Sequence, residues 1–158
     1  MDSYQLRSQY MNTMQYQLQI FHGDMKLRIG DINAPALADN ELRANLIEEE
    51  AAETVKAIRE GNFVETVDGL CDLLYVAFGA AVTFGIDLTP FFNEVHRTNM
   101  AKVGGPIRES DGKRLKPEGW KPPRLKVMLE MAEKGIYLPH QEPAITTAIE
   151  AFEKKANV

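Results

Sequence analysis

The chain has 158 residues, of which 44% are hydrophobic and 26% are charged, and its formal net charge at pH 7 is -5. That length and apolar content are enough for a hydrophobic core, and we expect residues 1–158 to form one domain. The excess of acidic residues argues against a protein that binds nucleic acid through its phosphate backbone.

Two further features limit the class of protein. Cys71 is the only cysteine, which excludes an intramolecular disulfide and a thiolate zinc site, and its place beside Leu70 predicts a thiol packed in a helix core. The N-terminus contains no basic region followed by an apolar run, and no stretch approaches the ~20 residues that span a bilayer. We therefore expect a soluble, cytoplasmic protein with no membrane partner.

The first third of the chain predicts two helices. Apolar residues recur at helical spacing from about Ser3 to Phe21, and a connection that contains glycine and proline follows over residues 23–35. Asp39 is a plausible N-cap for the second helix, which should run to about Glu60 and end at a Gly-Asn pair.

The second helix carries acids where an amphipathic helix should carry apolar side chains. With Leu46 as the reference direction and about 100° per residue, all three acids lie within about 60° of that direction. They are Glu49, Glu50 and Glu53. An unpaired buried carboxylate is costly, so such groups neutralise, pair with cations or bind a metal. We predict that these three acids point inward.

The next helix, predicted from about Phe63 to Phe84, carries a second acidic group. Asp68 and Asp72 lie one turn apart on one side of this helix, and no lysine or arginine occurs over residues 61–96 to neutralise them. Sets of oxygen ligands suit the hard cations Mg²⁺ and Mn²⁺. Inward-facing acids on two successive helices therefore predict a divalent-metal site.

The remaining third predicts a shorter helix and an irregular tail. A helix is expected over residues 88–101, with Pro90 tolerated in its first turn. Turn-forming residues dominate 103–123, and two peripheral helices follow at 124–134 and 144–155. Because no convincing β-run appears, we expect an all-α protein, an antiparallel helical bundle with an irregular C-terminal loop and peripheral helices.

Basic residues are concentrated after the acidic helices. This segment is suited to receive phosphates. Its members are Arg97, Lys102, Arg108, Lys113, Arg114, Lys116, Lys121, Arg124 and Lys126.

Four motifs follow one another along the chain. They are Glu49-Glu50-x-x-Glu53, Asp68-x-x-x-Asp72-Leu-Leu-Tyr, Glu94-Val-His-Arg97-Thr-Asn99-Met-Ala-Lys102 and Asp111-Gly-Lys113-x-x-Lys116. This ordered combination resembles the MazG-like all-α nucleoside triphosphate pyrophosphohydrolases, a group that includes phosphoribosyl-ATP pyrophosphohydrolase-like proteins, dimeric dUTPases and phage members. The resemblance covers about Arg43 to Pro123, within a motif core at about 39–123.

The resemblance implies an enzyme that cleaves a nucleoside triphosphate to the monophosphate and pyrophosphate, with two or more Mg²⁺ or Mn²⁺ ions per site. By motif position, Glu50, Glu53 and Asp72 would be metal ligands. Glu49 would be a further ligand or the catalytic base for the attacking water. The substrate's phosphates would be contacted by Asn99 and Lys102, with further candidates in Arg97, Lys113 and Lys116.

The second motif departs from the family pattern. Its members commonly carry Glu-x-x-Asp, which would place a glutamate at position 69, whereas this chain has Gly69 and an aspartate one residue earlier. Asp68 still lies on the Asp72 side of its helix, so we assign it the ligand role. Arg97 has an alternative role, a surface salt bridge with Glu94.

The resemblance leaves the base open, because the relatives include enzymes that act on dUTP and phage enzymes that act on dGTP or GTP. We expect a dNTP such as dGTP, or GTP or dUTP, with phosphoribosyl-ATP as the alternative substrate. Trp120 would stack on the base or, more commonly for a lone tryptophan between prolines, anchor a loop.

Two other classes of protein remain open. A di-iron or di-manganese oxidase is disfavoured, because the Glu-x-x-His motif of such sites does not occur. A metal-stabilised interaction module without catalytic activity would keep the acids but bind no triphosphate.

The helices are also apolar on a second side. Ile47, Ala51, Val55 and Ile58 lie about 100–180° from the Leu46 direction, and one thin bundle does not cover both faces. The resembled family forms dimers or dimers of dimers. We therefore expect a homo-oligomer, with a tetramer favoured over a dimer.

Overall fold

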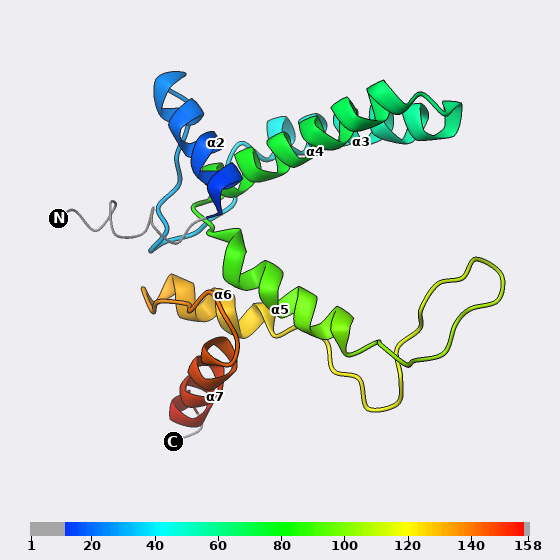
Figure 1. The fold of residues 1–158 in the computed structure, drawn as a ribbon. Coiled ribbons are helices and arrows are strands. Elements are labelled where there is room, and N and C mark those ends of the chain that lie inside the picture. The colour runs from blue at the N-terminus through cyan, green and yellow to red at the C-terminus, as the bar shows by residue number, and fades with distance from the viewer. Residues whose placement is uncertain (1–11, 157–158) are drawn as a thin grey trace. The chain divides into compact units, whose positions relative to one another are not determined.

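The computed structural model describes residues 12–156, which divide into two compact units at Leu88. The described residues contain six helices, and the only bridge of β type among them is an isolated pair between Ile107 and Arg114 (Figure 1). This confirms the all-α prediction.

The first unit contains α2 (Thr13–Asp24), α3 (Asn40–Glu60) and α4 (Phe63–Phe84). Helices α3 and α4 lie side by side as an antiparallel hairpin, and α2 packs against α4 (Figure 1). The predicted helices at these positions are confirmed, except that residues 3–11 of the first prediction lie outside the described residues.

Short local signals set the ends of α3 and α4. Gly61 and Gly85 follow the two helices in the left-handed conformation, with φ of 68° and 71°, which glycine adopts without steric cost. The side chain of Asn62 accepts a hydrogen bond from the Glu65 amide and caps α4. The prediction for Asp39 is wrong as to its side chain, because its φ is 50° and the carboxylate makes no capping hydrogen bond.

Small residues close the seam between α3 and α4. Thr54 and Ala57 of α3 are buried, as is Gly69 of α4. A Cβ atom at Gly69 would lie 2.6 Å from the Thr54 hydroxyl oxygen, so only glycine fits at this crossing without a shift. Glycine at position 69, where the resembled family commonly has a glutamate, therefore lets the two helices approach closely.

Helix α4 is more apolar than the sequence analysis anticipated. It has 22 residues and a window of mean hydropathy 1.5, so by length and composition alone it is able to cross a membrane. This corrects the expectation that no stretch approaches that length, because Asp68 and Asp72 interrupt the apolar run without lowering its mean hydropathy enough.

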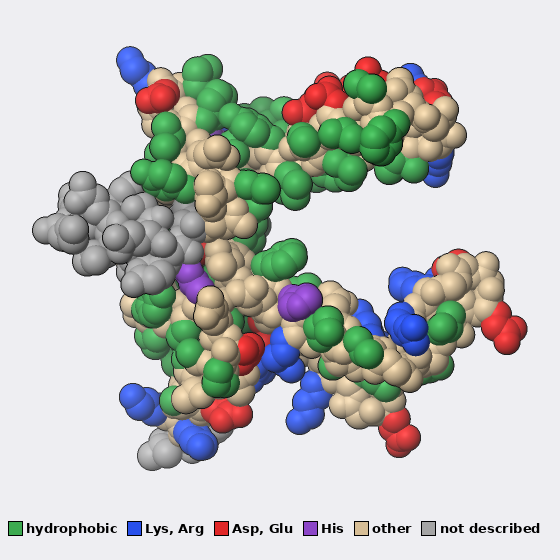
Figure 2. Space-filling model, in the orientation of Figure 1, with side chains coloured by type: hydrophobic (Ala, Val, Ile, Leu, Met, Phe, Trp, Pro, Cys, Tyr) green, Lys and Arg blue, Asp and Glu red, His purple; other side chains and the backbone are tan. Residues whose placement is uncertain are grey.

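One side of α4 is an exposed apolar stripe, and Figure 2 shows hydrophobic side chains gathered on the surface of the α3–α4 hairpin. Its members follow at three- and four-residue spacing, which places them on one face of the helix. They are Phe63, Val67, Leu70 and Leu74. Cys71 lies beside this stripe and is exposed, so the prediction of a core thiol is wrong: nothing in the described part of the chain covers this face.

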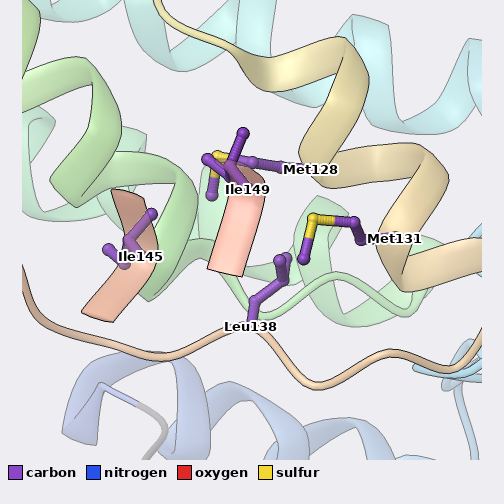
Figure 3. Packing of buried hydrophobic residues seen from close by; sticks show 5 residues of the cluster. All are labelled: Met128, Met131, Leu138, Ile145 and Ile149. Atoms are coloured by element: carbon purple, nitrogen blue, oxygen red, sulfur yellow. The ribbon is translucent and has the colours of Figure 1, made fainter. Parts of the chain in front are cut away.

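The second unit contains α5 (Leu88–Met100), α6 (Leu125–Glu133) and α7 (Ala144–Ala156), all close to their predicted bounds. Pro90 lies in the first turn of α5, as expected. Side chains from α6, α7 and the segment between them form the core of this unit (Figure 3). They are Met128, Met131, Leu138, Ile145 and Ile149, and each is buried.

Candidate functional site

The five acids predicted as metal ligands lie at the rim of the α3–α4 hairpin. Glu50 is half-buried, and the other four are exposed: Glu49, Glu53, Asp68 and Asp72. The prediction that the acids point inward is therefore wrong for the single chain. The buried residues of α3 are Arg43, Thr54 and Ala57, which lie about 20–80° around the helix from Leu46. The buried side of α3 is therefore the side of Thr54, and Glu49 and Glu53 lie away from it.

The five carboxylates nevertheless share one electrostatic environment. Partial burial raises the pKa of Glu50, and the negative charge of Asp72 raises it further. Smaller contributions of the same sign come from Glu53, Glu49 and Asp68. No ion pair joins any of these five acids to a basic residue within residues 12–156. The structure thus groups Glu50 with the other four predicted ligands, and no basic residue among residues 12–156 forms an ion pair with them.

The donor set fits a divalent cation. Five carboxylates supply only oxygen ligands, the kind that Mg²⁺ and Mn²⁺ prefer. As placed, no three histidine, cysteine or acidic side chains in the described part of the chain converge on one point where an ion would bind. The mutual repulsion that raises the pKa of Glu50 favours separation of the carboxylates. A metal would be held by Glu50, Glu53 and Asp72, with Glu49 and Asp68 adjacent.

The second unit contains a basic pocket after α5. Its cavity of about 350 Å³ is lined by Asn99, Lys102, Val103, Lys113 and Arg114. The ammonium of Lys102 donates a hydrogen bond to the Asn99 side-chain oxygen at 2.7 Å, so these two residues share a face, as their spacing predicts. Three basic residues and no acid line this pocket, which makes it suited to an anion.

Trp120 organises the loop beside the basic pocket. Its indole N–H donates to the carbonyl oxygen of Thr98 at 2.8 Å, which ties the loop to the last turns of α5. The ammonium of Lys116 lies 4.2 Å from the ring centroid, and that of Lys102 lies 5.6 Å away, both within cation–π range. Trp120 is therefore a loop anchor, and Lys116 is held next to the pocket rather than in its lining.

Arg97 is engaged with a buried carboxylate. Glu94 has no exposed surface, and it accepts hydrogen bonds from the Arg97 guanidinium at 2.8 and 2.7 Å and from the Arg124 guanidinium at 3.0 and 3.1 Å. Arg124 in turn donates to Thr146 of α7 at 2.8 Å. This network links α5, the start of α6 and α7. The pairing confirms Glu94 as the partner of Arg97, but the predicted surface location is wrong because Glu94 is fully buried.

The network also sets the charge state of Glu94. Burial by itself raises the pKa of this carboxyl, but hydrogen bonds from Arg97 and Arg124 outweigh burial and lower the pKa from 4.5 to about 2. Glu94 is thus held as a carboxylate at neutral pH. From the sequence, Glu94 is predicted only as a partner of Arg97, because nothing in its local pattern indicates that Arg124, thirty residues later, also bonds to it.

A family model described as phosphoribosyl-ATP pyrophosphohydrolase matches residues 20–99. That match covers half of the sequence and includes the five predicted metal ligands on α3 and α4. The chain belongs to this family. Membership confirms the resemblance drawn from the motifs.

One curated relative matches a shorter stretch. An uncharacterised protein of Acanthamoeba polyphaga mimivirus is 47% identical over 47 residues, which is 30% of this chain and 19% of the viral protein. The chain therefore spans about a fifth of the length of this relative.

Proposed function

We propose that the protein is a divalent-metal-dependent pyrophosphohydrolase that converts a nucleoside triphosphate to its monophosphate and pyrophosphate. The observation that carries this proposal is the group of five carboxylates around Glu50, which lies within the family match and has no basic partner in the described residues. A substrate with several negative charges approaches such a group only together with cations. The proposed substrate is a dNTP such as dGTP, or GTP or dUTP.

Each acid has a proposed role. Glu50, Glu53 and Asp72 hold two or more Mg²⁺ or Mn²⁺ ions, and Asp68 is a further ligand. Such ions, when bound, neutralise phosphate charge and activate water. Glu49 is exposed next to the half-buried Glu50, and it is the proposed base that accepts the proton of the attacking water, or else a further ligand.

The basic pocket of the second unit supplies the proposed phosphate contacts. Lys102 offers a point charge, and Asn99 positions its ammonium through the 2.7 Å hydrogen bond. Lys113 lines the same pocket, while Lys116 lies over Trp120 beside it. Arg97 is proposed as a minor contributor at most, because Glu94 occupies its guanidinium.

A homo-oligomer, with a tetramer favoured over a dimer, is the proposed assembly. The exposed apolar stripe of α4 supports it, since a contiguous apolar surface of this kind is usually an interface. The proposed location is the cytoplasm, with neither nucleic acid nor membrane as a partner.

A second candidate substrate is phosphoribosyl-ATP, which the description of the matching family names. It contains the same bond between the α and β phosphorus atoms and would use the same carboxylates. It therefore belongs in the same assay as the nucleoside triphosphates.

The test is a panel of ribo- and deoxynucleoside triphosphates and phosphoribosyl-ATP, each incubated with Mg²⁺ or Mn²⁺, with the products separated. We expect equal amounts of monophosphate and pyrophosphate, and no turnover when the divalent ion is chelated. Release of orthophosphate would show a different bond cleavage. Absence of turnover across the panel would favour the catalytically silent interaction module.

A further inference from the structure

A buried arginine in the first unit has no partner for its charge. Arg43 of α3 is only 7% exposed, yet its Nε has no hydrogen-bond partner. No ion pair links this arginine to an acid in the described part of the chain. Because an unpaired buried guanidinium is costly, its retention indicates a ligand that offers hydrogen-bond acceptors.

His22 of α2 faces the same point as Arg43. A Cβ atom at Gly79 of α4 would lie 3.4 Å from His22 Nε2 and 3.5 Å from Arg43 Nη1. The Nδ1 atom of His22 is 2.8 Å from the carbonyl oxygen of Arg28, which only accepts, so Nδ1 carries the hydrogen. In the neutral ring, Nε2 then presents a lone pair. A donor-only side chain and an acceptor thus meet above Gly79.

This pair lies along the same seam as the carboxylates. Glu50 is electrostatically coupled to Asp72, and seven residues away on each helix Arg43 approaches Gly79. Seven residues are two helical turns, or about 10 Å along the axis. That separation is on the scale of the distance between the α-phosphate and the base of a nucleotide.

Two aromatic rings lie between the level of the carboxylates and the level of the Arg43–His22 pair along the helix axis. Tyr75 is one turn from Asp72 and one turn from Gly79 on α4. Its ring packs edge to face against Phe21 of α2, with centroids 5.6 Å apart, and both side chains are partly exposed. Aromatic faces between a charged site and a polar recognition pair are suited to a planar base.

We propose that Arg43 and His22 recognise the base of the nucleotide and select bases with a lactam edge. The base carbonyl accepts a hydrogen bond from Arg43, and the adjacent ring N–H donates to His22 Nε2. Guanine, uracil and thymine carry this pair of groups. Adenine and cytosine carry an amino group beside a ring nitrogen that has no hydrogen. Their amino group would face the donor Arg43, and their ring nitrogen would face the acceptor His22 Nε2, so neither hydrogen bond would form. This inference rests on the proposed function and names its base selectivity.

The test compares kcat/KM for dGTP, dUTP, dTTP, dATP and dCTP with Mg²⁺. We expect the three lactam bases to be preferred in the parent protein. Arg43→Gln should lower their kcat/KM by roughly 5- to 150-fold, the effect of one good base contact, and change dATP and dCTP far less. Arg59→Gln, on an exposed position of the same helix, is the matched control and should keep the ranking.

If Arg43→Gln does not fold, a second variant tests the same inference. Gly79→Ala adds a methyl group at ordinary contact distance from His22 and Arg43, so the helix accommodates it while the space above Gly79 is filled. It should lower kcat/KM for the lactam bases more than for dATP and dCTP. An unchanged base ranking in the variants that fold, or a parent enzyme that prefers dATP or dCTP, would overturn the inference.

A binding experiment separates this inference from the proposed activity. If the parent hydrolyses no nucleotide, the proposed function fails, and uncharged nucleosides then test the recognition pair directly. Guanosine or uridine should shift the NMR signal of the Arg43 Nε–H group, and adenosine should not. An equal shift with adenosine, or no shift with any nucleoside, would overturn the inference on its own.

Discussion

Glu50 and Glu94 are carboxylates with opposite surroundings. Burial and four neighbouring acids raise the pKa of Glu50. Burial acts in the same direction at Glu94, but two arginines outweigh it and lower the pKa to about 2. A carboxylate satisfied by arginines contributes to the fold, whereas one surrounded by other carboxylates is available to a metal.

Loss of a single acid at the rim should remove activity without removing structure. We expect Glu50→Gln or Asp72→Asn to abolish turnover, because a lost ligand to the reacting phosphates costs several kcal/mol of transition-state stabilisation. Turnover within about tenfold of the parent would contradict the metal assignment. Glu48→Gln, on an exposed position of the same helix, is the control and should stay active.

The metal-free form of Glu50→Gln should be at least as stable as the parent. A carboxyl whose pKa is raised on folding contributes stability at low pH, and that contribution is lost as pH rises through the folded-state pKa. Thermal unfolding can be measured in the presence of a chelator at acidic and at neutral pH. Between these two pH values, the parent should lose more stability than the Glu50→Gln variant. A variant that unfolds at lower temperature at neutral pH would contradict this reasoning.

Glu94 should give the reverse pH dependence. Its lowered pKa means that its stabilising contribution, roughly 3 kcal/mol for a shift from 4.5 to about 2, is present above pH 4.5 and lost as pH falls toward 2. Glu94→Gln should destabilise the protein by about 3–5 kcal/mol at neutral pH, because two arginines lose their partner. Chemical denaturation at pH 7 measures this loss, and a change below about 1 kcal/mol would contradict a central role for the network.

The spacing of residues on α5 leads to a prediction at the scale of the element. Asn99 lies in the last turn of α5 and Lys102 just after it, and both line a pocket with two further basic residues. An ammonium recognises phosphate charge without distinguishing bases. Lys102→Ala should therefore lower kcat/KM by a similar factor for every accepted nucleotide, with the order of bases unchanged. A reordered base preference would place Lys102 at the base instead.

The residues at which helices end were more predictable from the sequence than the side on which each helix packs. Gly61 and Gly85 end α3 and α4 through local backbone geometry, which sequence reports directly. The direction in which α3 packs depends on Gly69 of the neighbouring helix, which admits Thr54 into the seam. The acids lie on the predicted helices, but they are more exposed than predicted. Partnerships between distant residues, such as Arg124 with Glu94, have no local signal.

At the scale of the whole molecule, the apolar stripe of α4 predicts assembly. Phe63 is 79% exposed and Leu70 is 47% exposed, which a single chain leaves uncovered. We expect light scattering at micromolar concentration to give the mass of a homo-oligomer. Leu70→Lys should shift the mass toward that of the monomer, whereas Ile136→Lys, at an exposed apolar position of the second unit, should not. A monomeric parent would contradict the proposed assembly.

Trp120 gives the molecule an intrinsic optical probe. It is the only tryptophan in the sequence, and its ring lies beneath the ammonium of Lys116 while its N–H is held by Thr98. Tryptophan emission therefore originates at one known position beside the basic pocket, and it responds to the charge above the ring. The emission of the unlabelled protein can therefore be recorded in stopped-flow experiments after nucleotide is added.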